Sequence, residues 1–175
     1  LSGQPAKPEI DLHLTGSRVG LGTDGIDTLN LDTKGTLATE GRLFGTVRAN
    51  HARFGTMHWD QGQLQLQGSL KDHSVTLEAR SKERSVGVTF TGAMVKHKWQ
   101  GSIRQASCID SQIGAWKQRQ PTPLAVSPEQ LELKDFCLDD TTSSAGLCLD
   151  GSWLAASKSW QVQAALNAFP VDTLG

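Results

Sequence analysis

Residues 63–90, QLQLQGSLKDHSVTLEARSKERSVGVTF, indicate a β-sheet more clearly than any other part of the chain. Three short runs place an apolar residue at every second position, with Gln, Thr, Glu or Arg between them. Successive side chains of a strand point to opposite faces, so each run would form a strand with one apolar and one polar face. Polar turn residues, Lys71-Asp72 and the charged segment 80–84, separate the runs.

The same alternation continues through most of the 175 residues. It predicts an all-β protein with little helix, built as an antiparallel meander of about ten to fourteen strands. Further turn signals are Asp24-Gly25, Lys34-Gly35, Asp60-Gln61-Gly62 and Asp139-Asp140. Helix signals are confined to a short turn within 111–116 and another after Pro170.

The chain is expected to form a single domain over residues 1–175. Segment 117–130 contains Pro121, Pro123 and Pro128, and it is expected to be an ordered loop or crossover rather than a linker between domains. No run of about 20 apolar residues is present to span a bilayer, and neither an initiator Met nor a signal peptide is seen. We therefore expect a fragment of a larger protein whose membrane anchor lies elsewhere.

Aligned strands of this kind predict a continuous apolar surface, and its candidate residues come from the whole chain. The residues predicted to line a hydrophobic groove on this surface are Leu29, Leu31, Leu64, Leu66, Val75, Leu77, Val86, Val88, Phe90, Leu131, Leu133, Phe136, Leu138, Leu147, Leu149, Val162 and Leu166. A weak motif, apolar-x-Gly-(Ser/Thr/Ala)-apolar, begins at residues 43, 66, 90, 99 and 149 and puts its Gly on the apolar side. Such glycines fit a bend in the sheet, or a close approach that leaves space for a guest chain.

Two of the three cysteines lie in matching contexts, Phe136-Cys137-Leu138 and Leu147-Cys148-Leu149. An antiparallel hairpin that pairs Leu138 with Leu147 also brings Cys137 opposite Cys148 on the other side. This register predicts a disulfide in an oxidising compartment, and the alternative is two unpaired small residues. Cys108 is left over, and no neighbouring His or acid suggests a nucleophile.

The formal charge of −1, from 17 basic and 18 acidic residues, provides no field to attract nucleic acid. Gly20-Leu21-Gly22-Thr23-Asp24-Gly25 has the letters of a dinucleotide motif, but a strand pattern follows where a helix is needed. The histidines are scattered without metal-ligand spacing and are expected to be exposed, and no nucleophile elbow occurs. We expect a non-enzymatic protein without metal or cofactor.

The C-terminal portion resembles the TamB family. The resemblance lies in residues 131–138 (LELKDFCL), 147–153 (LCLDGSW) and 168–174 (AFPVDTL), with Trp160-Gln161-Val162 between the last two. It implies a fragment of the C-terminal periplasmic region of a TamB-like protein. It also implies a long curved antiparallel sheet that folds over into a trough with a hydrophobic interior.

The resemblance further implies a periplasmic location, with the parent protein anchored in the inner membrane. The implied partners are a TamA-like outer-membrane barrel and, as guests of the groove, unfolded outer-membrane protein strands or phospholipid acyl chains. The implied roles are outer-membrane protein and autotransporter assembly and phospholipid transport between the membranes. Two alternatives remain: a structural β-solenoid of an adhesin or autotransporter passenger, and a carbohydrate-active sandwich with clustered Trp and carboxylates.

Overall fold

The computed structural model describes residues 2–4, 7–21, 24–36, 38 and 40–168, and these form one long antiparallel sheet of thirteen strands without a helix. The strands are β1 (Ser2–Gln4), β2 (Lys7–Leu21), β3 (Asp24–Thr36), β4 (Leu43–Phe54), β5 (Met57–Gly68), β6 (His73–Arg80), β7 (Arg84–Val95), β8 (Lys98–Asp110), β9 (Gly114–Gln118), β10 (Thr122–Val126), β11 (Gln130–Asp140), β12 (Gly146–Leu154) and β13 (Ser159–Asn167). The predicted all-β class and the antiparallel meander are confirmed.

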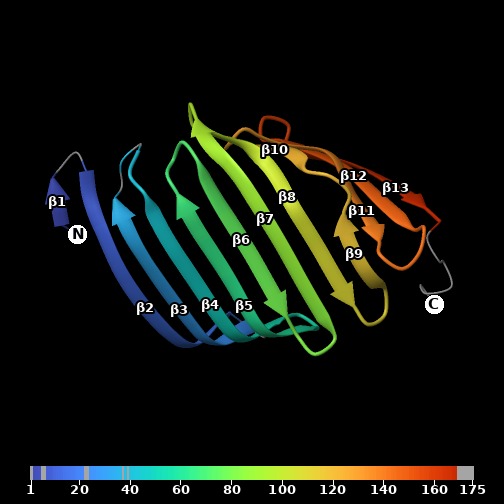
Figure 1. The fold of residues 1–175 in the computed structure, drawn as a ribbon, viewed down its shortest axis with the longest axis horizontal. Coiled ribbons are helices and arrows are strands. Elements are labelled where there is room, and N and C mark those ends of the chain that lie inside the picture. Colours follow the sequence, from blue (N-terminus) through green and yellow to red (C-terminus); the bar gives the residue numbers. More distant parts are fainter. Residues whose placement is uncertain (1, 5–6, 22–23, 37, 39, 169–175) are drawn as a thin grey trace.

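The strands lie side by side in chain order, from β1 at one edge to β13 at the other (Figure 1). Long strands such as β2 and β7 bend along their length, and the sheet twists so that β13 lies at an angle to β2 (Figure 1). A right-handed twist of this kind is what L-amino acids impose on any sheet. Among the described residues no helix offers the length and hydropathy needed to cross a membrane.

One interruption occurs, between β8 and β11. Strands β9 and β10 both pair antiparallel with these two neighbours, so together they occupy the width of a single strand broken at residues 119–121. The expectation of a loop over 117–130 is therefore wrong for residues 117–118, 122–126 and 130, which are paired. Pro121 lies in the break, and Pro123 occupies a position in β10 despite lacking a backbone donor.

Some of the predicted turns are observed, and others lie inside strands. Lys71-Asp72 forms the β5–β6 turn, and a turn follows directly after Asp139-Asp140. Lys34-Gly35 and Asp60-Gln61-Gly62 instead lie inside β3 and β5. Residues 111–113 turn as expected, but Gly114 already begins β9, and the segment after Pro170 lies outside the described residues.

Candidate functional site

Apolar residues lie opposite one another across seven consecutive strands, β2 to β8. One cross-strand row consists of Leu14, Leu31, Val47, Leu64, Leu77, Val88 and Ala106. Directly opposed Cβ atoms in a sheet lie about 5 Å apart, so these side chains touch in sequence from strand to strand. The row and the residues two positions away on each strand form what we call the apolar face.

The apolar face continues through β10 to β13. Leu131 pairs with Trp153, Phe136 with Leu149 and Leu138 with Leu147, and these β12 residues in turn face Trp160, Ala164 and Leu166 of β13. The observed registers place all the sequence-predicted surface residues, from Leu29 to Leu166, on this one face. Their predicted role as the lining of a groove stays a prediction, as does the folding of the sheet around a hydrophobic interior.

Two bulges keep the apolar face continuous where the sequence breaks its alternation. In β8 the register shifts opposite Thr89 and Phe90, so that Ile103 and Ala106 face the same side although they are three positions apart. In β11 the shift lies between Leu133 and Phe136. Asp135 adopts a positive φ of 55° there, and its N–H donates to Asp150 Oδ1 at 2.7 Å. A bulge adds a residue to one strand and so restores the phase of its side chains.

No second layer of the described structure covers the apolar face. Buried apolar residues are few, namely Ala52, Ile103, Ala106, Trp116, Cys137 and Ala145. Leu14 is 53% exposed, Leu77 40% and Leu166 60%. In an ordinary domain such a row would be sealed by another sheet or a helix. Contiguous exposed apolar surface on this scale is typical of an interaction site.

A hollow of about 960 Å³ lies on the apolar face at the rim where β4 begins and β5 ends. This rim, which also holds the ends of β3 and β7 and the starts of β6 and β8, is the upper rim in Figure 1. Apolar groups line most of the hollow, including Leu43, Leu66, Leu70 and Met94. The remainder is polar, with Lys7, Thr36, Glu40, Ser69 and His73.

Trp99 lies across three strands beside this hollow. Its indole Nε1–H donates to His73 Nε2 at 2.6 Å, which connects β8 to β6. Between them the ring passes over Gly92 and Gly101, where an added Cβ would lie 2.6 Å and 2.7 Å from ring atoms of Trp99. Two of the motif glycines therefore make room for an aromatic ring of the same chain rather than for a guest chain.

His73 was expected to be one of several scattered exposed histidines, and this is wrong. It is half-buried, and its Nδ1 lies 2.9 Å from the carbonyl oxygen of Ser69. That carbonyl accepts only from a protonated Nδ1, while Nε2 accepts from Trp99. Both contacts are satisfied by one neutral tautomer. The sequence contained no signal for this pair, because the two residues lie 26 positions apart.

The break between β9 and β10 is closed by buried polar side chains. Gln118 Nε2 donates to the carbonyls of Ile103 and Gln120 and to Thr122 Oγ1, at 3.1, 2.7 and 3.0 Å. Thr122 is completely buried, and its hydroxyl lies 3.3 Å from the carbonyl oxygen of Asp135. These contacts satisfy carbonyls that the broken strand leaves without ladder partners.

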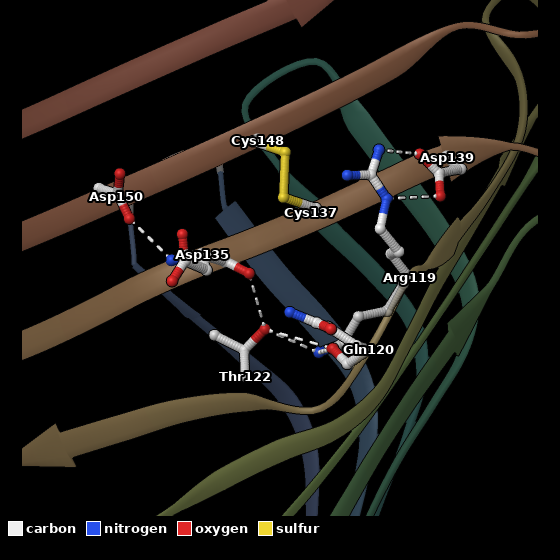
Figure 2. Close-up of a disulfide and its surroundings, with 9 residues drawn as sticks. Arg119, Gln120, Thr122, Asp135, Cys137, Asp139, Cys148 and Asp150 are labelled. Atoms are coloured by element: carbon white, nitrogen blue, oxygen red, sulfur yellow. Dashed lines mark hydrogen bonds and ion pairs between the residues drawn. A yellow bond between two sulfur atoms is a disulfide. The ribbon is translucent and has the colours of Figure 1, made fainter.

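On the polar face, Cys137 and Cys148 are directly opposed in the predicted register and form a disulfide, with their Cα atoms 4.1 Å apart (Figure 2). Nearby, the Arg119 guanidinium donates two hydrogen bonds to the Asp139 carboxylate, from Nε at 2.9 Å and from Nη2 at 2.6 Å. This guanidinium lowers the pKa of Asp139. Cys108 is a free, half-buried thiol whose pKa is raised by burial, which makes it a weak nucleophile at neutral pH.

The sequence-based list missed several residues of the apolar face. Leu14 and Val47 complete the row that runs from Leu14 to Ala106. Near the upper rim, a second row joins the predicted Leu131 to five residues absent from the list, namely Met94, Trp99, Val126, Trp153 and Trp160. For Leu14, the alternation of Leu12 and Leu14 with His13 was the signal that the sequence offered. Within the described ranges no cluster of three or more His, Cys, Asp or Glu could hold a metal ion.

Comparison with known proteins identifies the chain at the level of the family. No curated protein and no solved structure matched it. One family model did match, that of the TamB N-terminal domain, over residues 1–175. The expected family is thereby confirmed, whereas the expected position in the C-terminal periplasmic region is not supported, since the matching model describes the N-terminal domain. The chain belongs to the TamB family.

Proposed function

We propose that this chain is a non-enzymatic carrier segment of a TamB-like protein, whose apolar face holds the acyl chains of phospholipids on their way between the inner and outer membranes. The row from Leu14 to Val88 supports the proposal best, because it crosses the six strands β2 to β7 without a polar residue and no second layer of the described structure covers it. An acyl chain laid along such a surface gains about 0.8 kcal/mol for each methylene removed from water.

The setting of the proposal follows from the family. TamB-like proteins belong to the bacterial envelope, and we place this chain on the periplasmic side, with an outer-membrane barrel of the TamA type as the partner of the parent protein. A disulfide between Cys137 and Cys148 is compatible with an oxidising compartment such as the periplasm. The solenoid alternative loses support, because it requires parallel coils and the strand pairs found here are antiparallel.

Native mass spectrometry of the purified chain, with extraction and identification of bound lipid, tests the proposal. Leu64→Asp and Val88→Asp place a charge on the apolar face, and Gln65→Asp places the same charge on the opposite face of the same strand. Leu64 and Val88 are only half-buried, so the new carboxylates stay hydrated and the sheet should survive. Circular dichroism checks this directly.

Lipid should co-purify with the wild-type chain and with Gln65→Asp, and it should be lost from Leu64→Asp and Val88→Asp. Equal lipid content in all four proteins, or lipid in none of them, would contradict the proposal. Leu64 and Gln65 are neighbours in β5, so the comparison of these two variants excludes a general effect of negative charge.

A strand of an unfolded outer-membrane protein is a second candidate guest, and the edge of the sheet favours it. β13 pairs only with β12 among the described residues, and its side chains are exposed throughout. Open edges of this kind accept an added strand through main-chain hydrogen bonds. A peptide with the alternating sequence of a barrel strand should then shift the amide resonances of β13 and leave those of β5 unchanged. Unaltered β13 resonances would exclude this guest.

A further inference from the structure

We infer that the apolar face is covered by the apolar face of a second copy when no lipid occupies it, so that the lipid-free chain is a symmetric dimer of two sheets packed face to face. The inference rests on the proposed function in one respect, namely that lipid displaces the second copy. The dimer itself is argued from the extent of the open surface and can be tested without lipid.

The accessible surface of the chain is far larger than that of a compact protein of the same mass. It amounts to 11977 Å² for 18.8 kDa, whereas the usual relation between surface and mass gives about 8,300 Å². The excess, about 3,700 Å², arises because a single layer of strands leaves both of its faces open (Figure 1). Water satisfies the polar face, so the apolar face is the part of this surface that needs a cover.

The area of the open surface favours a second sheet as its cover. Stable homodimer interfaces bury about 2,000–5,000 Å² in total, or about 1,000–2,500 Å² from each copy, and the excess surface of this chain is larger than that. An acyl chain of about 16 carbons removes at most about 500 Å² of apolar surface from water, since one methylene corresponds to about 32 Å². One phospholipid therefore leaves much of the face open, whereas a second sheet covers it in one step.

The shape of the sheet allows two copies to pack in this way. Packed sheets keep their strand directions within about 30° of each other, which requires that their twists match. Identical sheets have the same twist, so a twofold arrangement meets this condition by symmetry. The ends of the apolar face are its most exposed parts, with Leu14 of β2 53% and Val162 of β13 68% exposed. A twofold axis parallel to the strands places the β2 end of one copy against the β13 end of the other.

The charges of the chain permit this association. The formal net charge of −1 gives two copies almost no mutual repulsion. Arg84 and Asp110 lie on the apolar face at the rim opposite the upper rim, two positions beyond Val86 and Cys108, and they form an ion pair of 2.5 Å. A partner sheet that approaches this end therefore meets a neutralised pair, which avoids the large cost of burying an unpaired charge.

Sedimentation equilibrium of the full 175-residue chain, stripped of lipid and measured at micromolar concentration, tests the dimer. The expected mass is twice 18.8 kDa. Leu14→Asp and Val162→Asp should lower the association constant by on the order of 100-fold or more, because a symmetric interface contains each new carboxylate twice. Thr15→Asp and Gln163→Asp place the same charge on the adjacent residue, on the polar face, and should leave the association constant unchanged. Circular dichroism verifies that each variant is folded.

A lipid-free chain that stays at 18.8 kDa, or that forms only larger assemblies without a dimer, would overturn the inference. So would a dimer that is lost in Gln163→Asp and retained in Leu14→Asp and Val162→Asp. That pattern would indicate that two copies pair through the open edges of β13, where a charge at the middle of the strand lies next to its symmetry mate.

A short-chain phosphatidylglycerol, kept below its critical micelle concentration, tests the displacement. It should convert the dimer into a lipid-bound monomer, and native mass spectrometry resolves the two. Lipid binding by a chain that never dimerises refutes the face-to-face dimer and leaves the carrier function intact. A dimer that neither binds the lipid nor dissociates in its presence refutes the carrier function and the displacement, while the dimer stands.

Discussion

Removal of the Cys137–Cys148 disulfide should lower the free energy of unfolding by about 3 kcal/mol. The bridge closes a loop with a sequence separation of 11. Loop-closure entropy for a chain of that length is about 9 cal/mol/K, which amounts to about 2.8 kcal/mol at 25 °C. The bond also fixes the register of β11 against β12 close to the bulge at Asp135, where the ladder is interrupted.

Urea unfolding of the oxidised chain, the reduced chain and the double variant Cys137→Ala/Cys148→Ala measures the effect. With a denaturant slope of about 2 kcal/mol/M, the midpoint should fall by about 1.5 M in the latter two. Cys108→Ala serves as the control, because its thiol is free and half-buried, and its midpoint should stay within about 0.3 M of the wild type.

Thiol counting verifies the starting state. The oxidised, denatured chain should expose one reactive thiol, from Cys108, and the reduced chain all three. Equal midpoints for the oxidised and reduced chains would refute the reasoning, since the loop entropy would then contribute nothing to stability. Hydrogen exchange of the β11 and β12 amides shows whether any loss is local to this hairpin or shared by the sheet.

The remaining predictions concern three other features. Gly101→Ala should lower the free energy of unfolding by more than about 3 kcal/mol, because its Cβ would lie 2.1 Å from the Thr91 carbonyl oxygen. Gly151→Ala should be neutral or stabilising, because its Cβ would have nothing within 4 Å. Midpoints of urea unfolding measure both effects. Thr122→Val should lower the free energy of unfolding by about 1–3 kcal/mol, because it removes the buried hydroxyl that accepts from Gln118 Nε2 and donates to the Asp135 carbonyl. Equal stability of the variant and the wild type would contradict a stabilising role of this hydroxyl. The pKa of Asp110 in the folded chain is lowered by the Gln112 N–H and by Arg84. The ionised carboxylate therefore contributes fully to stability above its pKa in the unfolded chain, and this contribution is lost as the pH falls through its pKa in the folded chain. Asp110→Asn should flatten the decline in stability below about pH 4, and an unchanged decline would refute the assignment.

The sequence alone determined the fold class, the face of each regular strand and the pairing of one hairpin. Alternation has a period of two, the same as the pleat, so Leu64 and Leu66 could be assigned to one face without coordinates. The cysteine hairpin was predictable because three residue pairs, including Leu138 with Leu147, agreed on one register. Information of this kind is local, and it is carried by residues close together in the chain.

The tertiary structure decided what depends on contacts between distant strands or on irregular backbone. The split strand β9–β10 exists because β8 and β11 both offer ladder partners to residues 114–118 and 122–126, whereas the prolines had predicted a loop over 117–130. The bulges in β8 and β11 preserved the apolar face where the alternation failed. The hydrogen bond between Trp99 and His73 joins residues two strands apart, with the indole ring over Gly92 and Gly101. Such features depend on which strands become neighbours, and side-chain periodicity contains no record of that.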